Sequence, residues 1–363
     1  MGREEETYCL AALLQVAGIG RQRALALVAA VGSARKVWQA DKGDLFLSKH
    51  LRAESLAALA VARGERLPER LAEQCRRAGV KVTAIGAATY PRLLAQIPDA
   101  PPALYYRGEL PVDERALAIV GTRRATPYGL AVAKDMAAEF AGQGAVVISG
   151  GAAGIDGAAH AGALACGRTV AVLGCGVDVC YPPKHRQLFE QIAANGALVS
   201  EYAPGTPPAP GRFPERNRII SGLSAGVVVV EAGQRSGALI TADLSLDYNR
   251  EVFCVPGSVF SPVSRGTHAL IKQGARLVER PAEVLAELRW PAQTAEPCAM
   301  PTLSGEEQAV LAACCAEQVT TGETILTQTG FAPAKAAGLL LALEMKKLIK
   351  RSENGYWRLK GRS

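Results

Sequence analysis

The chain lacks long apolar segments and the residue spacing of a zinc site. No run approaches the roughly 20 uninterrupted apolar residues of a membrane-spanning helix. The first residues, Met1 to Glu6, are not a basic region followed by an apolar stretch. The nine cysteines form no Cys-x-x-Cys pair and have no companion histidines at zinc spacing. We therefore expect a soluble cytoplasmic protein with no membrane contact and no metal site.

Familiar catalytic arrangements are also missing. The four histidines, His50, His160, His185 and His268, are isolated in the sequence, and no grouping with serine and aspartate stands out. The glycine-rich loops match neither Gly-x-Gly-x-x-Gly nor Gly-x-x-x-x-Gly-Lys-Ser/Thr, which counts against a dinucleotide-dependent oxidoreductase and a P-loop NTPase. We expect no enzymatic activity and no bound cofactor.

The charge balance favours an acidic partner. The 363 residues carry a formal net charge of +7, and the pI is about 9.0. Long-range attraction and counterion release make nucleic acid the first partner to consider. A hydrophobic share of 49% with 21% charged residues is ordinary for a soluble globular protein. A chain of this length is expected to contain two or three domains.

The composition changes twice along the chain. Residues 1–75 are rich in alanine and leucine at helical spacing, which predicts a small helical domain. Residues 80–290 alternate strand-like and helical patterns. The proline-containing stretch 290–297 suits a linker, and residues 300–363 have the pattern of helices followed by a hairpin. We therefore predict three domains with these boundaries.

The central region predicts an α/β domain. Near-continuous apolar runs separated by helical patterns are typical of a parallel sheet with helices on both faces. Residues 90–105, which precede this pattern, are expected to be an extended, proline-rich lead-in. The predicted strands are Leu117–Val120, Ala145–Ile148, Thr169–Leu173, Ala197–Val199, Val227–Val230 and Val252–Val255.

The N-terminal region contains a segment, Leu13 to Leu25, that resembles a helix-hairpin-helix of the SAM-like type. A Gly-Ile-Gly turn at 18–20 joins an apolar helix to a helix that opens with basic residues. Glycines let backbone N–H groups approach a phosphate, and Arg21 or Arg23 would add charge. The alternative is a connection in which glycine merely ends a helix.

The C-terminal region predicts a winged-helix-like domain. Ser304 stands three residues before Glu307, as in a capping box, at the start of a helix that runs to Ala316. Short and long helices follow at 324–329 and 332–349, and Asn354-Gly355 predicts a two-residue hairpin turn. Such domains place a helix in a DNA groove or mediate protein contacts only, and both alternatives are open.

The loop after the first predicted strand has the residues of a phosphate site. Gly121 allows close backbone approach, Thr122 offers a hydroxyl, and Arg123 offers a planar fork suited to phosphate. Thr126 is the expected N-cap of the next helix, with Pro127 at its first position. The alternative is a tight turn whose arginines are only solvated.

The loop after the second predicted strand consists of small residues. From Ser149 through Gly150 and Gly151 to Gly154 it presents a row of N–H donors at the start of a helix. Asp156 is expected to cap that helix, or to accept a hydrogen bond from a sugar or base.

A third cluster combines basic residues with an aromatic ring. Arg212, Arg216 and Arg218 surround Phe213 and Asn217. Guanidinium groups beside an aromatic face suit single-stranded nucleic acid, because bases stack and the backbone is neutralised. The alternative is a solvated basic turn with Phe213 in the core.

A fourth segment, Ser236 to Thr241, follows the strand that ends at Glu231. Ser236 and Gly237 would add hydroxyl and N–H donors at another helix start, or would simply cap that helix.

The order of these motifs closely resembles that of the DNA-processing protein A family, also called DprA or Smf. The motifs span about residues 80–290, and the helical and winged-helix-like flanks match a common arrangement in the family. The matching strings are Gly-Thr-Arg at 121–123 with Thr-x-Tyr-Gly at 126–129, Ser-Gly-Gly-Ala-Ala-Gly-Ile-Asp at 149–156, Tyr-Pro-Pro at 181–183, Ser-Glu-Tyr-Ala-Pro-Gly at 200–205, Phe-Pro-Glu-Arg-Asn-Arg at 213–218, the segment 231–241, Pro-Gly at 256–257 and Gly-Thr-His-Ala-Leu-Ile at 266–271.

This resemblance implies a non-catalytic DNA-binding protein. Its core would be an extended Rossmann-like domain that forms a homodimer and has a positively charged DNA pocket. It would bind incoming single-stranded DNA during natural transformation, protect it and help to load the RecA recombinase. Single-stranded DNA, RecA and a second copy of the chain are thus the implied partners.

The pocket residues carry over from the family by position. Arg123, the Ser149–Gly154 loop and the Arg216-Asn217-Arg218 cluster would form the pocket, with Lys272 nearby. The chain departs from the family at His268, where the family usually has asparagine, and this puts any contact through that side chain in doubt.

Two other functions are possible for a chain with these residues. A phosphoribohydrolase sharing this type of core would need a carboxylate beside the sugar, for which Asp156 or Glu231 could serve. The Pro-Gly-Gly-x-Gly-Thr loop of such enzymes is absent from the sequence. A transcription regulator acting through the winged helix would explain only the last sixty residues.

Overall fold

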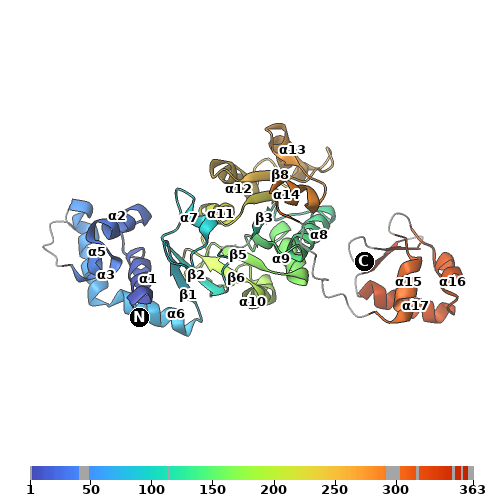
Figure 1. The fold of residues 1–363 in the computed structure, drawn as a ribbon, viewed down its shortest axis with the longest axis horizontal. Helices are drawn as coiled ribbons and strands as arrows, with labels where there is room; N and C mark the ends of the chain where they lie inside the picture. Colours follow the sequence, from blue (N-terminus) through green and yellow to red (C-terminus); the bar gives the residue numbers. More distant parts are fainter. Residues whose placement is uncertain are drawn as a thin grey trace. The chain divides into compact units, whose positions relative to one another are not determined.

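The structure is a computed structural model that describes residues 2–40, 49–112, 115–291, 303–315, 319–345, 348–352 and 355–358. The chain forms two compact units, which we call unit 1 (residues 1–296) and unit 2 (residues 297–363) (Figure 1). The finer division into domains of residues 1–75, 80–290 and 300–363 stays a prediction. None of the described helices is long and apolar enough to cross a membrane.

Unit 1 is built around a mixed sheet in which parallel pairs dominate. Its strand order is β1-β2-β6-β5-β4-β3-β7-β8-β9. The pairs β1–β2 and β2–β6 are antiparallel, and every pair from β6 to β9 is parallel. The predicted parallel sheet is therefore confirmed. The strands are β1 (Lys81–Ala84), β2 (Ala103–Gly108), β3 (Ala116–Val120), β4 (Val146–Ser149), β5 (Thr169–Leu173), β6 (Ala197–Ser200), β7 (Gly226–Val229), β8 (Glu251–Cys254) and β9 (Arg276–Leu277).

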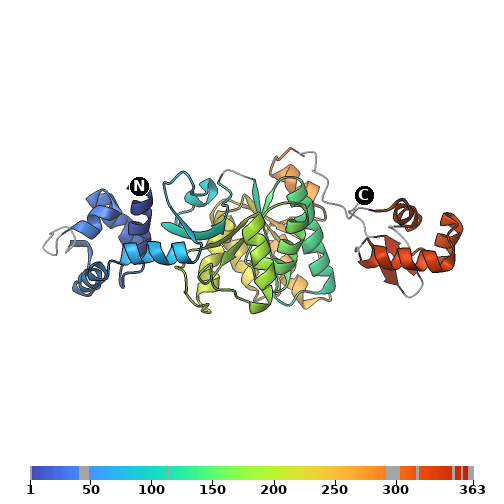
Figure 2. The same ribbon diagram turned by 90° about the horizontal axis from the view of Figure 1, so that it is seen from below.

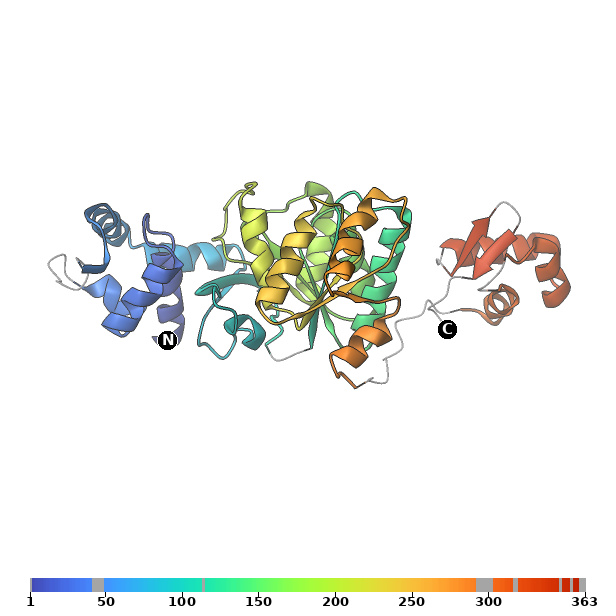
Figure 3. The same ribbon diagram turned by 90° about the horizontal axis from the view of Figure 1, so that it is seen from above.

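Helices cover both faces of the sheet because the central strands are apolar on both sides. Ile119 packs on one face, in a cluster with residues of α8 and α9. Its neighbour Ala118 packs on the other face with residues of α11 and α12. Figure 2 shows the first set of helices in front, and Figure 3 the second. The helices are α7 (Arg92–Ala95), α8 (Pro127–Gly142), α9 (Ile155–Cys166), α10 (Arg186–Asn195), α11 (Arg212–Gly222), α12 (Gly237–Asp247), α13 (Arg265–Lys272) and α14 (Pro281–Glu287).

The six predicted strands are present, and three further strands were not predicted. The expected lead-in at 90–105 contains the short helix α7 and the beginning of β2. Prolines at 101 and 102 directly precede β2. Because of them, the sequence predicted an extended lead-in here and not the beginning of a strand. β1 has only four residues, and β9 has two exposed ones. Neither of these edge strands has the apolar run by which the other strands were found.

The N-terminal helices pack against one another and against the sheet. One cluster joins their apolar faces, and a second places Ala11 and Leu71 beside Leu173 and Leu198 of the sheet. The helix-hairpin-helix pattern is present between α1 and α2, where Gly18 has φ +77°. These helices are α1 (Gly2–Leu13), α2 (Arg21–Val31), α3 (Ala34–Gln39), α5 (Ala53–Gly64) and α6 (Leu67–Arg77).

The basic residues of this hairpin are engaged inside unit 1. Arg23 Nη1 donates to the carbonyl of Gly18 at 2.7 Å. Arg21 Nη1 lies 3.4 Å from the carbonyl oxygen of Asp99 and 3.8 Å from the carboxylate of Glu201. The hairpin arginines therefore stabilise the turn and its packing on the sheet domain.

Unit 2 contains three helices and a hairpin, as predicted, but the third helix was expected at 332–349 and covers Pro333–Met345, whereas Ile349 begins a strand. Ser304 and Glu307 form the predicted capping box at the start of α15. Gly355 is the first residue of β11 rather than a turn residue, and Asn354 lies outside the described residues. Apolar residues including Val310, Ile325 and Leu343 form the core of the unit. The elements are α15 (Gly305–Ala313), α16 (Gly322–Thr329), α17 (Pro333–Met345), β10 (Ile349–Ser352) and β11 (Gly355–Arg358).

Candidate nucleic-acid interface

The glycine-rich loops meet at the carboxyl ends of the central parallel strands. After β3 the chain continues to β4 on one side, and it returns to β7 on the other side of β3. Such a switch in strand order opens a crevice in which ligands of α/β sheets bind. The loops after β3, β4 and β5 and the start of α11 converge there, and we call this region the carboxyl edge.

The loop after β3 is anchored at both ends, and it exposes the arginines between them. Thr122 donates its N–H to the carbonyl of Glu231 at 2.7 Å. The carboxylate of Glu231 accepts the Thr126 N–H at 2.9 Å and the Thr126 hydroxyl at 2.5 Å. Thr126 also caps α8, as predicted, by accepting the Gly129 N–H at 3.1 Å. Arg123 and its neighbour are exposed to solvent.

A cation and two aromatic rings form the surface beside this loop. The Arg123 guanidinium lies over the Phe213 ring, 5.2 Å from its centroid. Phe213 in turn lies 5.6 Å, centroid to centroid, from Tyr181, which is 42% exposed. Sequence reasoning used Tyr181 only as part of a motif. The structure adds it to Phe213 as a ring on which a base can stack.

The loop after β4 supplies backbone donors rather than side chains. Ser149 is fully buried, and its hydroxyl donates to the carbonyl of Ile119 at 2.6 Å. Gly151 and Gly154 have φ angles of +67° and +84°. Within the described part of the chain, the N–H groups of Gly151, Ala153 and Gly154 donate to no protein acceptor. They lie at the start of α9, where the helix dipole favours an anion.

Asp156 supports this loop from inside the protein. The sequence predicted that Asp156 caps α9, and it does not. The N-cap of α9 is Gly154, which has no side chain with which to cap the helix. Asp156 Oδ2 accepts the Ala152 N–H at 3.3 Å. The Asp156 side chain is buried. Although the residue belongs to the first turn of α9, its side chain lies inside the protein and not at the helix end. Burial raises the pKa of Asp156, and the charge of Arg216 opposes that rise.

Arg216 is buried opposite Asp156. It is 4% exposed, and its Nη1 donates to the carbonyl of Val172 at 2.6 Å. Burial lowers its pKa to about 10, and Asp156 opposes that change, so it keeps its charge at neutral pH. A side chain at Gly150 would overlap both charged groups. The two residues therefore place opposite charges close to one another beneath the glycine loop.

Two further members of the third cluster, Arg218 and Asn217, make polar contacts within the protein. Arg218 is 4% exposed and pairs with Glu201, and its Nε lies 3.7 Å from Asp99. Asn217 donates to the carbonyl of Gly237 at 3.2 Å. The structure therefore separates this cluster into Phe213 and Asn217, which are partly exposed, and Arg216 and Arg218, which are buried.

The fourth segment and α13 lie beside this edge. Ser236 caps α12 by accepting the Ala238 N–H at 3.3 Å. Lys272 is the last residue of α13, about 10 Å along the helix from Gly266, which contacts the chain after β7. His268 lies 3.1 Å from the carbonyl of Gly257 through Nε2, so it supports that loop.

His185 is a further supporting residue that sequence reasoning did not assign. Its Nδ1 lies 3.0 Å from the carbonyl of Gly151, and its ring packs edge-on against Phe189. An isolated histidine just after a Tyr-Pro-Pro string carries no signal of this role. Only the fold brings it under the glycine loop.

His160 is buried without charge. Nδ1 lies 2.7 Å from the Thr169 hydroxyl, which donates to Val147. Within the described residues, Nε2 has no hydrogen-bond partner. Burial lowers the pKa of His160 to about 3, and the nearby His185 and Arg216 act in the same direction. This environment is that of a core histidine.

The burial of His160 in its neutral form predicts that the folded protein loses stability in acid. Its folded pKa lies below the ordinary value of about 6.5, so the unfolded chain binds the proton more tightly. The stabilisation is complete above pH 6.5 and is lost as the pH falls toward 3. We expect a loss of about 2 kcal/mol between pH 7 and pH 5, measured by denaturant unfolding. The His160→Gln variant should lose less stability than the wild type over this range. The control variant His50→Gln, at an exposed position, should lose as much as the wild type. An equal loss in His160→Gln would contradict this assignment.

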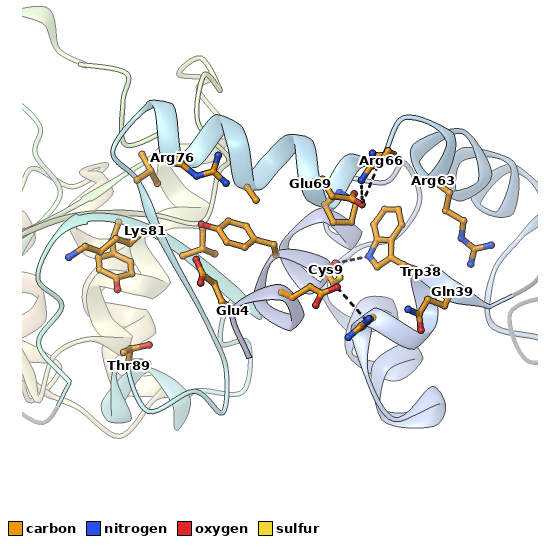
Figure 4. Close-up of a pocket in the computed structure, with 18 residues that line it drawn as sticks. Glu4, Cys9, Trp38, Gln39, Arg63, Arg66, Glu69, Arg76, Lys81 and Thr89 are labelled. Atoms are coloured by element: carbon orange, nitrogen blue, oxygen red, sulfur yellow. Dashed lines mark hydrogen bonds and ion pairs between the residues drawn. The ribbon is translucent and has the colours of Figure 1, made fainter. Parts of the chain in front are cut away.

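A cavity of about 950 Å³ lies elsewhere in unit 1, between the N-terminal helices and the β1–β2 edge (Figure 4). Its rim carries both signs of charge. Arg35 Nε lies 3.4 Å from Glu5, and Arg66 Nη2 lies 3.4 Å from Glu69. These two arginines of the cavity rim are thus paired with carboxylates.

The fold and these loops define a class of protein: a Rossmann-like α/β protein whose glycine-rich loops meet at the carboxyl edge of the sheet. A family model described as DNA recombination-mediator protein A matches residues 81–289. The chain belongs to this family, the DprA/Smf family that its motifs had indicated.

Relatives support this assignment over much of the chain. Protein Smf of Synechocystis sp. is 45% identical over 229 residues, covering 61% of this chain and 55% of that protein. The putative DNA processing protein DprA of Mycobacterium tuberculosis is 42% identical over 269 residues, covering 72% and 69%. The chain thus spans about half the length of the first relative and about two thirds of the second.

Solved structures agree with the fold. The X-ray structure of DNA processing protein A from Streptococcus pneumoniae aligns with a TM-score of 0.67 at 34% identity, covering 78% of this chain and 97% of that one. A structure of the Helicobacter pylori protein, described for its single-stranded DNA binding mode, aligns with a TM-score of 0.54 at 30% identity, covering 60% and 99%.

Proposed function

We propose that this protein binds single-stranded DNA at the carboxyl edge and acts as a recombination mediator without catalysing a reaction. The observation that carries the proposal is the exposed Arg123 stacked on Phe213, beside Tyr181 and the backbone N–H groups of the glycine loop. Arginine and backbone donors would hold phosphates while the aromatic rings stack with bases, a combination that tolerates any sequence. The single-stranded DNA binding mode described for the Helicobacter pylori relative supports this choice of ligand.

The predicted site residues would divide into two groups. Those that would contact DNA are Gly121, Thr122, Arg123, Gly150, Gly151, Gly154 and Phe213. Those that would hold the contact groups in place are Ser149, Asp156, Arg216, Asn217, Arg218, Ser236 and Gly237. Lys272 would contribute charge from α13, farther along the strand's path.

The absence of catalysis is also part of this proposal. Both carboxylate oxygens of Glu231 are bonded to Thr126, and Asp156 is buried against Arg216. A phosphoribohydrolase would need a carboxylate beside the sugar, and these are the two residues that could supply it. Their structural engagement favours a binding protein over that enzyme.

The proposed partners beyond DNA are RecA and a second copy of the chain, in the cytoplasm. The finer roles in this proposal are protection of incoming DNA and RecA loading during natural transformation. Membership of a family described as DNA recombination-mediator protein A supports them. The loop between β8 and α13 exposes Val259 and Phe260, which are 74% and 91% exposed. An exposed apolar pair of this kind suits a protein–protein contact such as the homodimer.

Binding to matched oligonucleotides tests the function. We expect labelled single-stranded DNA to bind more tightly than its duplex, and its affinity to fall as salt rises, since each phosphate contact releases counterions. Fluorescence anisotropy with the full chain at two salt concentrations measures both. Equal affinity for duplex, or binding to neither form, would reject the proposal, and the second outcome would call for a nucleotide-hydrolysis assay.

A further inference from the structure

Glu231 is a buried carboxylate with no role in direct DNA contact. It follows β7 at the switch in strand order, and it is 3% exposed. Its two side-chain oxygens accept the N–H and the hydroxyl of Thr126, and its carbonyl accepts the N–H of Thr122. A single residue therefore makes three hydrogen bonds to the loop after β3.

These three bonds hold the loop on both sides of Arg123. Thr122 directly precedes Arg123, and Thr126 begins α8 three residues after it. A loop fixed at both positions leaves its backbone little freedom, so the direction of the arginine side chain over Phe213 is set in advance. Preorganisation of this kind lowers the entropy that binding must otherwise overcome.

The charge of Glu231 is balanced without using an arginine. Its partners are neutral groups at the first turn of α8, where the helix dipole favours a negative charge. Among the described residues, no lysine or arginine forms an ion pair with it. The Arg123 guanidinium thus stays free for phosphate, although a carboxylate fixes the loop that carries it.

Gly129 makes this arrangement possible. A Cβ atom at this position would overlap the side chain of Glu231. The position lies in α8, where alanine would otherwise be favoured by its higher helix propensity. Glycine lets the first helical turn pass over the carboxylate.

We propose that Glu231 is a positioning residue for Arg123: it fixes the loop after β3 so that the guanidinium meets the DNA backbone. This inference rests on the proposed single-strand binding at the carboxyl edge. It assigns to Glu231 the affinity gained by holding Arg123 in place.

The experiment alters the contact between Glu231 and the first turn of α8 with one substitution on each side of it. Glu231→Gln removes its charge, and Gly129→Ala places a methyl group against it. Matched controls lie at the other end of α8: Glu139→Gln removes an exposed charge, and Gly142→Ala adds a methyl group in ordinary contact distance. Anisotropy with a single-stranded oligonucleotide should give about 10-fold weaker binding for the first two variants and under twofold change for the controls.

A double-mutant cycle separates positioning from general damage. In an Arg123→Ala background, Glu231→Gln should weaken binding less than twofold, because the group that it positions is gone. A further 10-fold loss in that background would mean a merely structural role and would overturn the inference. Wild-type affinity in Glu231→Gln would overturn it too.

Hydrogen exchange tests the hold on the loop whether or not DNA binds. The Thr122 and Thr126 amides should exchange faster in Glu231→Gln and Gly129→Ala than in the controls. Unchanged exchange would reject the inference even if Arg123→Ala weakens DNA binding and the proposed function stands. Failure of the wild-type chain to bind single strands, with faster exchange in the variants, would instead reject the proposed function and with it the role toward DNA.

Discussion

Replacing Arg123 with alanine is expected to weaken single-strand binding about 10- to 100-fold at moderate salt. The change removes a charge-assisted hydrogen bond of about 1.5–3 kcal/mol to a phosphate, and it uncovers the Phe213 ring on which the guanidinium lies. The slope of log affinity against log salt should become shallower by about 0.7 for each phosphate that the protein no longer neutralises. Salt titrations by anisotropy measure both effects.

The control for this prediction removes an equal charge elsewhere. Arg70 lies on α6, exposed and paired with Glu65. Arg70→Ala should change affinity less than twofold and leave the salt slope unaltered, since its charge is already balanced. If Arg123→Ala kept the wild-type slope, the carboxyl edge would not be the site of phosphate contact.

Replacing Arg216 with alanine is expected to destabilise unit 1 by about 3–5 kcal/mol. The change leaves Asp156 buried without its opposing charge and the Val172 carbonyl without its donor. A typical domain is stable by about 5–15 kcal/mol, so this loss is a large part of the total. Chemical denaturation followed by circular dichroism measures it.

A second substitution distinguishes an unpaired charge from a packing defect. Adding Asp156→Asn to Arg216→Ala should restore part of the stability, because a neutral amide costs less to bury than an unpaired carboxylate. Arg212→Ala, one turn earlier on α11 and partly exposed, should cost under about 1 kcal/mol. If Arg216→Ala were as mild as Arg212→Ala, the assigned attraction between the buried charges of Arg216 and Asp156 would be wrong.

The sequence predicted the central strands and loops because their signals are local. Each apolar run is followed by small residues, and a parallel sheet places all such loops at one edge. Hydrogen bonds at Thr126, Ser236 and Ser304 likewise confirm predicted helix starts, since an N-cap depends only on residues within one turn.

The direction in which a charged side chain points is not a local signal. Arg212 and Arg216 are one turn apart on α11 and lie on a similar face, yet only Arg216 is covered by the glycine loop. Its burial depends on Asp156 and Val172, which are 60 and 44 residues earlier in the chain. The role of Glu231 is not a local signal either, because its hydrogen bonds to Thr126 join residues 105 positions apart. From the sequence alone, Glu231 therefore stayed a candidate catalytic carboxylate.

The measurement that tests the central claim most directly is photo-cross-linking of a single-stranded oligothymidylate to the full chain, with the attachment points mapped by mass spectrometry. We predict cross-links at Phe213 and Tyr181, reduced in Arg123→Ala. Cross-links confined to residues 1–75 or 300–363, with none at the carboxyl edge, would contradict the account.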